Sequence, residues 1–387
     1  MAQPTLTVAP NRHIDIARLM EILNDQKARA MDVIAGSGTL SCQDGKLIIA
    51  GTEARLSPDG VTSCDGTYEL NDIALGGIAE KLKIPGPYLR RMADENLPAL
   101  DYNINTWLER DHRRFLVRCR RSANAAAGAD GVTHAFLSDR FLRLDNLDVL
   151  LAALDGIRKA GVAVKVASCD LTDRRVYVRF ISPEVQVMAP ELLRNYRSPF
   201  DGRRGSDLPV IFGGFLLTNS ETGFGKYSVA PFIRVEICKN GQTIDKGVLS
   251  RTHIGAKITD DDGIIDPSPQ TLRKLLELIT AQTIDAVRAY LDVDFVTRAV
   301  RDLEQAAGIV VSRPDETIKI VGKELKYTEE QQKEILAHFI TGADLSAGGI
   351  MQAVTSFGRS VADADVAYRM ETTATQALHL AARAATA

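Results

Sequence analysis

The chain has 387 residues, of which 45% are hydrophobic and 25% charged, and its formal net charge is -3 at pH 7. This length exceeds one typical core, so we expect two or three domains or subdomains. The composition argues against general disorder. The slightly acidic total excludes a uniformly basic protein, so any nucleic-acid surface must be a local patch.

The cysteines and histidines indicate neither a disulfide framework nor a metal centre. Five cysteines and six histidines are spread along the chain without a CxxC or HxxxH pair. We therefore expect reduced thiols, no bound metal and no cofactor. The first residues lack the apolar core of a signal peptide, and no run of about 18 apolar residues occurs. These features predict a soluble protein of the cytoplasm (the host's, if the chain is phage-encoded) with no membrane partner.

The first part of the chain predicts helices and short hairpins. Residues 14–35 have apolar side chains at helical spacing, and Gly36 would end this helix. Short alternating runs with Asp-Gly turns follow and predict small antiparallel hairpins. Residues 73–92 predict two short helices joined by a tight turn, with Lys83 at the usual turn-glycine position. A plain helical hairpin is favoured over a DNA-reading helix-turn-helix, although Arg90 and Arg91 would lie on the second helix.

The middle of the chain predicts mostly strands. The segment ERDHRRFLVRCRR, residues 109–121, reads as an arginine-rich strand on which Arg118 and Arg120 share one face. A helix is expected to begin near Asn146, and strand-like runs dominate from 162 to 250.

Within these strands, the loop SETGFG could be a phosphate-binding loop, an active-site lid or a hairpin turn. It has no GxxxxGK[ST] pattern and is followed by a strand rather than a helix, which favours the hairpin turn. We predict antiparallel hairpins over 208–250, with turns at 221–225 and 240–241.

The pattern after residue 266 is helical. Ser268 and Pro269 would begin one helix, and Asp292 a second that runs through Leu303. Thr328 and Gln331 form a capping box for another, and two further helices are expected over 346–386. Apolar faces on these helices predict self-association into a homo-oligomer. One such apolar face consists of Leu272, Leu275, Leu276 and Ile279.

The order of the elements predicts an α+β fold, because strands and helices are grouped rather than alternating. We expect a central, mostly antiparallel sheet with long β-hairpins. The chain would divide into an N-terminal helix and hairpin region over 1–105, a mixed-sheet core over 106–265 and a C-terminal helical region over 266–387.

Two segments suggest chemistry only weakly. The loop ITDDDGIIDPS holds Asp260, Asp261, Asp262 and Asp266, but their spacing is not that of an EF-hand, and a solvated loop is favoured over a Mg²⁺ or Ca²⁺ site. In SRTHIG, Ser250 and His253 have no third orienting group, so an anion contact by Arg251 is favoured over hydrolysis, and a structural role over both. We therefore predict that the protein is not an enzyme.

Two arginine clusters, interleaved with aromatic residues, are the main candidates for binding. Guanidinium groups neutralise phosphates and aromatic rings stack on bases, so the clusters predict one electropositive groove for single-stranded DNA. Solvated faces with local ion pairs are the alternative. With Arg251, the candidate DNA-binding residues are Arg113, Arg114, Arg118, Arg120, Arg121, Arg194, Tyr196, Arg197, Phe200, Arg203 and Arg204.

Four motifs occur in a fixed order between about residues 60 and 385. They are FLSDRFLRLDNLDVLLAAL, GGFLLTNSETGFGKYSVAPFIRVEICKNG, SRTHIGAKI and GGIMQAVTSFGRSVADADVAYRMETTA. This ordered set resembles the phage- and plasmid-borne family known as domain of unknown function 932. The matching positions are Arg143, Asp145, Asn146, Asn219, Ser220, Gly223, Cys238, Asn240, Gly241, Arg251, His253, Gly255, Gln352, Ala353, Val354 and Thr355.

The chain departs from the family pattern in two places. Gln352 stands where the family has asparagine, and Glu221 and Thr222 widen the hairpin turn. The resemblance implies the biology of a mobile element rather than a particular reaction.

Taken together, these patterns predict a phage-type, non-enzymatic protein that binds single-stranded DNA, as an oligomeric annealing or recombination factor. The first alternative is a structural or interaction protein of a mobile element, such as an assembly or anti-host factor, without nucleic-acid binding. The second is a metal-dependent enzyme that uses the loop at Asp260.

Overall fold

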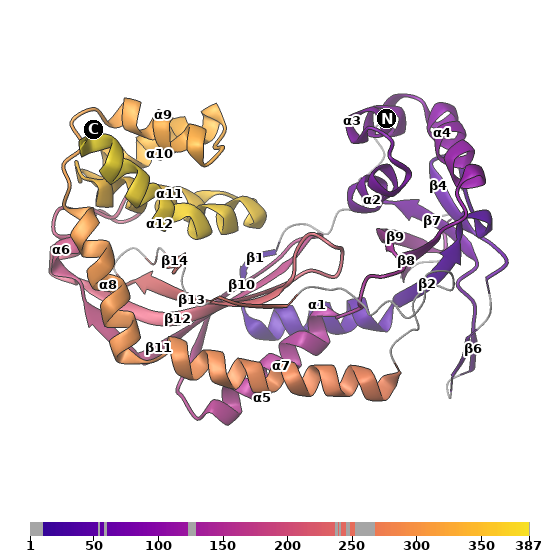
Figure 1. Cartoon of the computed structure of the whole chain (residues 1–387), viewed down its shortest axis with the longest axis horizontal. Coiled ribbons are helices and arrows are strands. Elements are labelled where there is room, and N and C mark those ends of the chain that lie inside the picture. The colour runs from indigo at the N-terminus through magenta and orange to yellow at the C-terminus, as the bar shows by residue number, and fades with distance from the viewer. Residues whose placement is uncertain are drawn as a thin grey trace.

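The computed structural model describes residues 11–52, 55–57, 60–122, 129–236, 239, 241–244, 248–251 and 268–386. The fold is α+β with mainly antiparallel sheets, which confirms the class predicted from the sequence. The strands form two large sheets that lie toward opposite ends of the molecule (Figure 1). We call them sheet A and sheet B and describe each with the helices that cover it.

Sheet B and three helices form the lobe at the right of Figure 1. Its strands pair in the order β2-β8-β9-β7-β4-β3, and only β7 and β9 are parallel. The strands are β2 (Ala30–Gly36), β3 (Leu40–Gln43), β4 (Lys46–Ile49), β7 (Gly66–Leu70), β8 (Arg114–Arg121) and β9 (Gly131–Ser138). Since β8 and β9 belong here, the lobe continues past residue 105, where we expected the first region to end.

One face of sheet B packs against α2 (Asp72–Leu82), α3 (Gly86–Glu95) and α4 (Leu97–Arg110). Leu75, Leu89 and Ile104 come from these helices and meet Phe115 and Val117 of β8 in one core. The helical hairpin predicted over 73–92 is confirmed, and Lys83 has the positive φ of 57° that its turn requires. The strands β5 (Arg55–Ser57) and β6 (Gly60–Thr62) form a separate two-stranded hairpin.

Sheet A pairs its strands in the order β1-β10-β11-β12-β13-β14, and β15 also pairs with β13. The strands are β1 (Asn11–Ile14), β10 (Lys165–Leu171), β11 (Val176–Met188), β12 (Val210–Asn219), β13 (Tyr227–Val235), β14 (Gly241–Thr243) and β15 (Leu249–Arg251). All of these pairings are antiparallel.

Helices cover both faces of sheet A (Figure 1). Three of them, α1 (Ile16–Ala28), α5 (Asn146–Ala160) and α7 (Pro269–Tyr290), run along one face. Two others, α11 (Ala347–Ser360) and α12 (Ala364–Thr386), lie over the other face. The remaining helices are α6 (Pro190–Leu193), α8 (Val293–Ala307), α9 (Pro314–Glu324) and α10 (Glu329–Gly342).

The two faces of sheet A differ in polarity because side chains alternate along each strand. On β11, Val178 and Phe180 join the large core that contains residues of α1, α5 and α7. Their neighbour Tyr177 contacts α12 at Ala364, and Arg179 pairs with Glu371 of the same helix. The face toward α12 therefore carries charged and hydroxyl groups, and the candidate sites lie on this side.

The long hairpin predicted over 208–250 is confirmed for β12 and β13, which pair from Ile211↔Val235 to Thr218↔Ser228. Their connection includes the predicted turn at 221–225, so SETGFG is a hairpin turn. Gly214 is required on β12, because an added Cβ would lie 2.0 Å from the carbonyl oxygen of Phe180. Of the second predicted turn, Asn240 lies outside the described residues and Gly241 begins β14.

The predicted helix over 14–35 is wrong in its second half. Helix α1 ends at Ala28, and residues 30–36 form β2. Met31, Val33 and Ala35 are buried while their neighbours are less so, which is the two-residue period of a strand. Pairing with β8 along the whole of β2 outweighs the local helical spacing.

The C-terminal helices begin where the sequence predicts. Ser268, Asp292 and Thr328 cap α7, α8 and α10, and Thr328 forms its capping box with Gln331. Two helices, α11 and α12, cover 347–360 and 364–386. The apolar face that we expected to mediate self-association packs inside the chain instead. Ile279 is buried in the large core, and the partly buried side chains that pack against this core include Leu272, Leu275 and Leu276.

Candidate functional site

The two predicted arginine clusters do not share a groove. Residues 113–121 belong to β8 in the sheet-B lobe, whereas residues 194–204 follow α6 at the other end of the molecule (Figure 1). The second segment is held on the C-terminal helices, where the backbone N–H of Arg197 donates to the carbonyl of Gly342 (2.9 Å). The prediction of one continuous groove is therefore wrong, because the fold separates the two segments.

The arginines of the first cluster have different environments. Arg113, Arg114 and Arg121 are exposed, and Arg113 makes a 2.6 Å ion pair with Asp111. Arg118 is buried and Arg120 is largely covered, and both face the hairpin turn at Glu221. The predicted shared face of Arg118 and Arg120 is confirmed, but Arg118 cannot line a groove because it is only 1% exposed.

The second cluster consists mainly of exposed arginines with local partners. Arg194 pairs with Glu191 and Arg203 with Asp201, and the hydrogen bonds from Arg203 and Ser198 lower the pKa of Asp201 to about 2. Arg197 and Arg204 are also exposed.

The two aromatic residues of this cluster are not equivalent. Tyr196 is only 2% exposed, so its predicted stacking on a base is wrong. Phe200 is exposed, and the guanidinium of Arg359 lies over its ring at 4.1 Å.

A buried polar network joins the two lobes, and we call it the Arg118 junction. Arg118 donates to Asp32 at 2.8 Å, to Asp145 at 2.6 Å and to the carbonyl of Glu221 at 3.1 Å. The Glu221 carboxylate accepts from Arg120 (3.3 Å) and from the backbone N–H of Asn146 (2.6 Å). These bonds connect β8, the start of α5 and the β12–β13 turn.

The charges of the Arg118 junction stabilise one another. Burial alone would lower the pKa of Arg118, but Asp32, Asp145 and Glu221 outweigh it and raise that pKa. Burial would likewise raise the pKa of Asp145, but Arg118 outweighs it and lowers that pKa. Arg118 and Asp145 are therefore ionised near neutral pH, and the network fixes how the hairpin turn sits on sheet B.

Two motifs of the sequence resemblance meet at this junction. The Asn219 side chain donates to the carbonyl of Leu144 (3.0 Å) and to the Asn146 side chain (2.9 Å). These residues are distant in the chain, and the sequence gives no sign that the two motifs touch. Their position indicates a structural role, which holds the hairpin against the start of α5.

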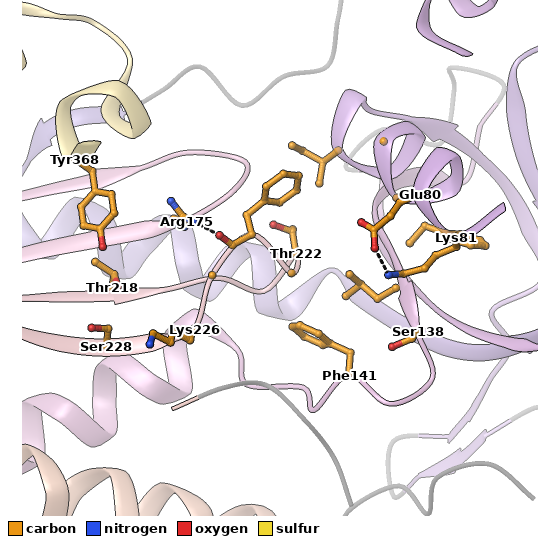
Figure 2. Close-up of a pocket in the computed structure, with 18 of the residues that line it drawn as sticks. Glu80, Lys81, Ser138, Phe141, Arg175, Thr218, Thr222, Lys226, Ser228 and Tyr368 are labelled. Carbon is orange, nitrogen blue, oxygen red and sulfur yellow. Dashed lines mark hydrogen bonds and ion pairs between the residues drawn. The ribbon is translucent and has the colours of Figure 1, made fainter. Parts of the chain in front are cut away.

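A cleft of about 910 Å³ lies between the lobes, next to the β12–β13 turn. We call it the interlobe cleft. In Figure 2, Glu80, Lys81, Ser138 and Phe141 of the sheet-B lobe face residues of sheet A and α12 across it. The facing residues labelled there are Arg175, Thr218, Lys226, Ser228 and Tyr368.

The charges around the interlobe cleft are mainly positive. Lys81, Arg90, Arg175 and Lys226 line it, and Glu80 is the one carboxylate among the described lining residues. Glu80 is paired with Lys81 at 2.6 Å. Within the described part of the chain, Arg90 and Lys226 are exposed and make no ion pair. An excess of positive charge in a concave site attracts anions.

Aromatic rings accompany these charges. Phe224, at the hairpin turn, is 40% exposed, and Arg174 lies over its ring at 5.1 Å. Arg175 donates to the carbonyl of Phe224 and also lies 5.7 Å from the ring of Tyr368. Phe141 adds a third ring from the sheet-B side.

Sequence reasoning missed these residues. Arg90, Arg175 and Lys226 are far apart in the chain, and none belongs to the two clusters that a local count of arginines detects. The sequence places Arg90 only on the second helix of the hairpin at 73–92. The one usable signal was the loop SETGFG, whose Phe224 lies between glycines at the hairpin turn.

Some candidates lie outside the described residues. They are Asp260, Asp261, Asp262, Asp266 and His253, as well as the side chain of Arg251, whose backbone ends β15. In the part of the chain that the structure describes, no group of three or more His, Cys, Asp or Glu side chains is arranged to hold a metal ion. None of the described helices has the length and apolar composition needed to cross a bilayer.

No protein-family model, curated protein or solved structure matches this chain. The resemblance to the domain of unknown function 932 family therefore stays a prediction.

Proposed function

We propose that the protein binds single-stranded nucleic acid, with DNA as the expected ligand, in the interlobe cleft. The observation that carries this proposal is the set of cationic and aromatic side chains that both lobes contribute to one concave site. Arg90, Arg175 and Lys226 can neutralise phosphates, and Phe224 offers a ring on which a base can stack.

A single strand fits this site better than a duplex. Stacking on Phe224 requires a base whose face is free, and the bases of a duplex are stacked on one another. The helical hairpin of α2 and α3 packs into the core of its lobe, with Leu75 and Leu89 buried. Arg90 reaches the interlobe cleft from α3, which gives this helix a role in charge neutralisation rather than in reading a groove.

The role that we propose is binding, without catalysis, in an annealing or recombination factor that forms a homo-oligomer. The described lining of the interlobe cleft contains hydroxyl groups, such as those of Ser138 and Thr222, but no histidine or cysteine to activate them. The expected phage or plasmid origin belongs to the same proposal and rests on the sequence resemblance.

Fluorescence anisotropy with a 3′-labelled oligothymidylate tests the proposal. The double variant Arg90→Gln/Lys226→Gln removes two cations that make no ion pair in the described chain, so its fold should be kept. We expect weaker binding to every sequence. The slope of log affinity against log salt should fall by roughly 1.4, since each lost phosphate contact accounts for about 0.7.

The matched control is Arg203→Ala/Arg204→Ala, which removes two exposed arginines at the other end of the molecule. The proposal expects this control to bind like the parent. Loss of binding in the control alone would assign DNA to the segment after α6 and contradict the interlobe cleft. A parent that binds no oligonucleotide would leave the interaction-protein alternative in first place.

A further inference from the structure

A second pocket lies on the same face of sheet A, beside α11 and α12, and it shares no lining residue with the interlobe cleft. Its volume is about 260 Å³. Strands β1, β10, β11 and β13 and the last turn of α11 all contribute to it, so the pocket is formed by residues distant in sequence. We call it the five-cation pocket, after the residues that line it.

Those five residues are Arg12, Arg179, Arg234, Lys239 and Arg359, and Glu371 is the one carboxylate among the described lining residues. Gly241 and Phe232 also line the pocket, and they pack so closely that a Cβ on Gly241 would lie 2.0 Å from the Phe232 ring. Like charges that line one pocket repel one another, and a bound anion would relieve this repulsion.

The acidic groups nearby are already engaged by two of the arginines. Arg179 makes a bidentate pair with Glu371 (2.8 and 3.0 Å) and contacts Asp170 at 2.5 Å. Arg12 pairs with Asp170 at 3.2 Å and donates to the carbonyl of Val361 at 2.6 Å. These five cations and two carboxylates carry three more positive than negative charges, and Arg234 and Arg359 have further partners in the chain.

The positive charges of the pocket also lower the pKa of the neighbouring His13. Burial is the largest cause that lowers the pKa of His13, and the positive charges of Arg12, Arg179 and Arg359 lower it further against the effect of Asp170. Arg12 lies 3.0 Å from Nε2 of His13, where a neutral ring accepts a hydrogen bond. His13 therefore adds no positive charge at neutral pH.

We infer that the five-cation pocket binds a phosphate group, either free phosphate or a phosphate monoester. Guanidinium and ammonium groups are the usual donors to phosphate oxygens, and here they converge from several elements. The Ser168 hydroxyl also lines the pocket and can donate to an oxyanion, whereas the Thr355 hydroxyl already donates to the carbonyl of Gln352 (3.0 Å). The volume admits a phosphate and a few further atoms rather than a long polymer.

Two sources of this group are consistent with the chemistry: the terminal phosphate of a nucleic-acid strand and a free phosphate or small monoester. The inference does not rest on the proposed function, since it uses none of the residues of the interlobe cleft. Variants of the five-cation pocket test the phosphate inference, and variants of the interlobe cleft test the proposed binding of nucleic acid, so each can fail without the other.

The test is thermal unfolding of the full chain with sodium phosphate, against sodium chloride at equal ionic strength. We expect a saturable rise in Tm of about 2 °C when phosphate is about ten times its Kd. Lys239→Gln, an exposed position, should reduce the rise and weaken the apparent affinity about tenfold or more, as for a lost charged contact. Arg359→Gln is a second pocket variant and should have the same effect on the phosphate-dependent Tm. Agreement between the two variants shows that the effect does not come from a local structural change at one position.

Lys323→Gln is the matched control, since Lys323 is exposed on α9 and does not line the pocket. It should respond to phosphate like the parent. No saturable rise in the parent, or an equal rise in the parent and in both pocket variants, would overturn the inference.

Oligonucleotides with and without a 5′-phosphate then identify the source. Tighter binding of the phosphorylated strand, lost in Lys239→Gln but kept in Arg90→Gln/Lys226→Gln, supports a strand end. Equal binding of the two strands, together with a phosphate-dependent Tm, supports a free phosphate or small monoester.

Discussion

His134 is a buried ionisable side chain that the proposed sites do not use. It lies on β9 and is 5% exposed, and neither ring nitrogen has a hydrogen-bond partner among the described residues. Burial, together with the positive charges of Arg120 and Arg118, holds its pKa well below the usual value of 6.5. The folded protein therefore keeps this ring neutral at pH values where an unfolded chain protonates it.

This difference predicts a pH-dependent stability. The pKa of His134 is lower in the folded chain than in the unfolded one. The contribution of His134 to the free energy of unfolding is therefore fully present above about pH 6.5. As the pH drops below this value, the free energy of unfolding falls by about 1.4 kcal/mol for each pH unit. His134→Leu removes the titrating group and should flatten this fall between pH 6.5 and 5. Urea unfolding at a series of pH values measures it.

His112→Leu is the matched control, because His112 is exposed just before β8. It should keep the slope of the parent. Parallel pH profiles for the parent and His134→Leu would contradict the explanation.

At the scale of elements, the β12–β13 turn has two roles. The Glu221 carboxylate of this turn accepts hydrogen bonds from Arg120 of sheet B and from the backbone N–H of Asn146 at the start of α5. Phe224 and Gly225 of the same turn line the interlobe cleft. The carboxylate thus positions the residues that we assign to binding. A change at Glu221 should affect the cleft although Glu221 does not line it.

Glu221→Ala leaves the Arg120 side chain and the Asn146 N–H without this acceptor. We expect a loss of about 3 kcal/mol in the free energy of unfolding, because a mostly buried ion pair loses one partner. Amide exchange over residues 219–226 should also accelerate. Chemical denaturation and hydrogen-exchange mass spectrometry provide the two measurements.

Glu184→Ala is the control, an exposed carboxylate on β11 of the same sheet. It should change neither stability nor exchange at the turn. Unchanged exchange in Glu221→Ala would show that the turn is held by other contacts.

The elements that the sequence predicted are those with local signals. Ser268, Asp292 and Thr328 each cap a helix through hydrogen bonds within a few residues, so the sequence contains the whole interaction. β2 was missed because its pairing with β8 is made by residues distant in the chain. The same holds for the interlobe cleft, since Arg90 and Lys226 are single basic residues that only the fold brings to one site.

At the scale of the whole molecule, we still expect a homo-oligomer. The face at Leu272 packs against the chain's own core, so association must use other apolar residues. Val310, Ile340 and Leu345 are more than half exposed on the C-terminal helical part. Val310 and Leu345 lie close together, since the N–H of Val311 donates to the carbonyl of Leu345 (3.0 Å).

Size-exclusion chromatography with light scattering should give a mass of more than one chain at micromolar concentration. Val310→Asp/Leu345→Asp places two charges in the contact and should shift the protein to monomer. Val293→Asp, exposed at the start of α8, is the control and should keep the parent's mass. A monomeric parent, with or without an oligonucleotide, would contradict the prediction.

The edge strand β1 has a consequence for how the protein is made. Asn11 pairs with Leu171 of β10, but the whole sheet-B lobe lies between them in the chain. At ribosomal rates, β10 follows β1 after roughly 10–30 s. During this interval sheet B can complete its strands from β2 to β9, while β1 has no partner. Translation therefore orders the assembly: sheet B can close first, and β1 can pair only after all the strands of sheet B have been made.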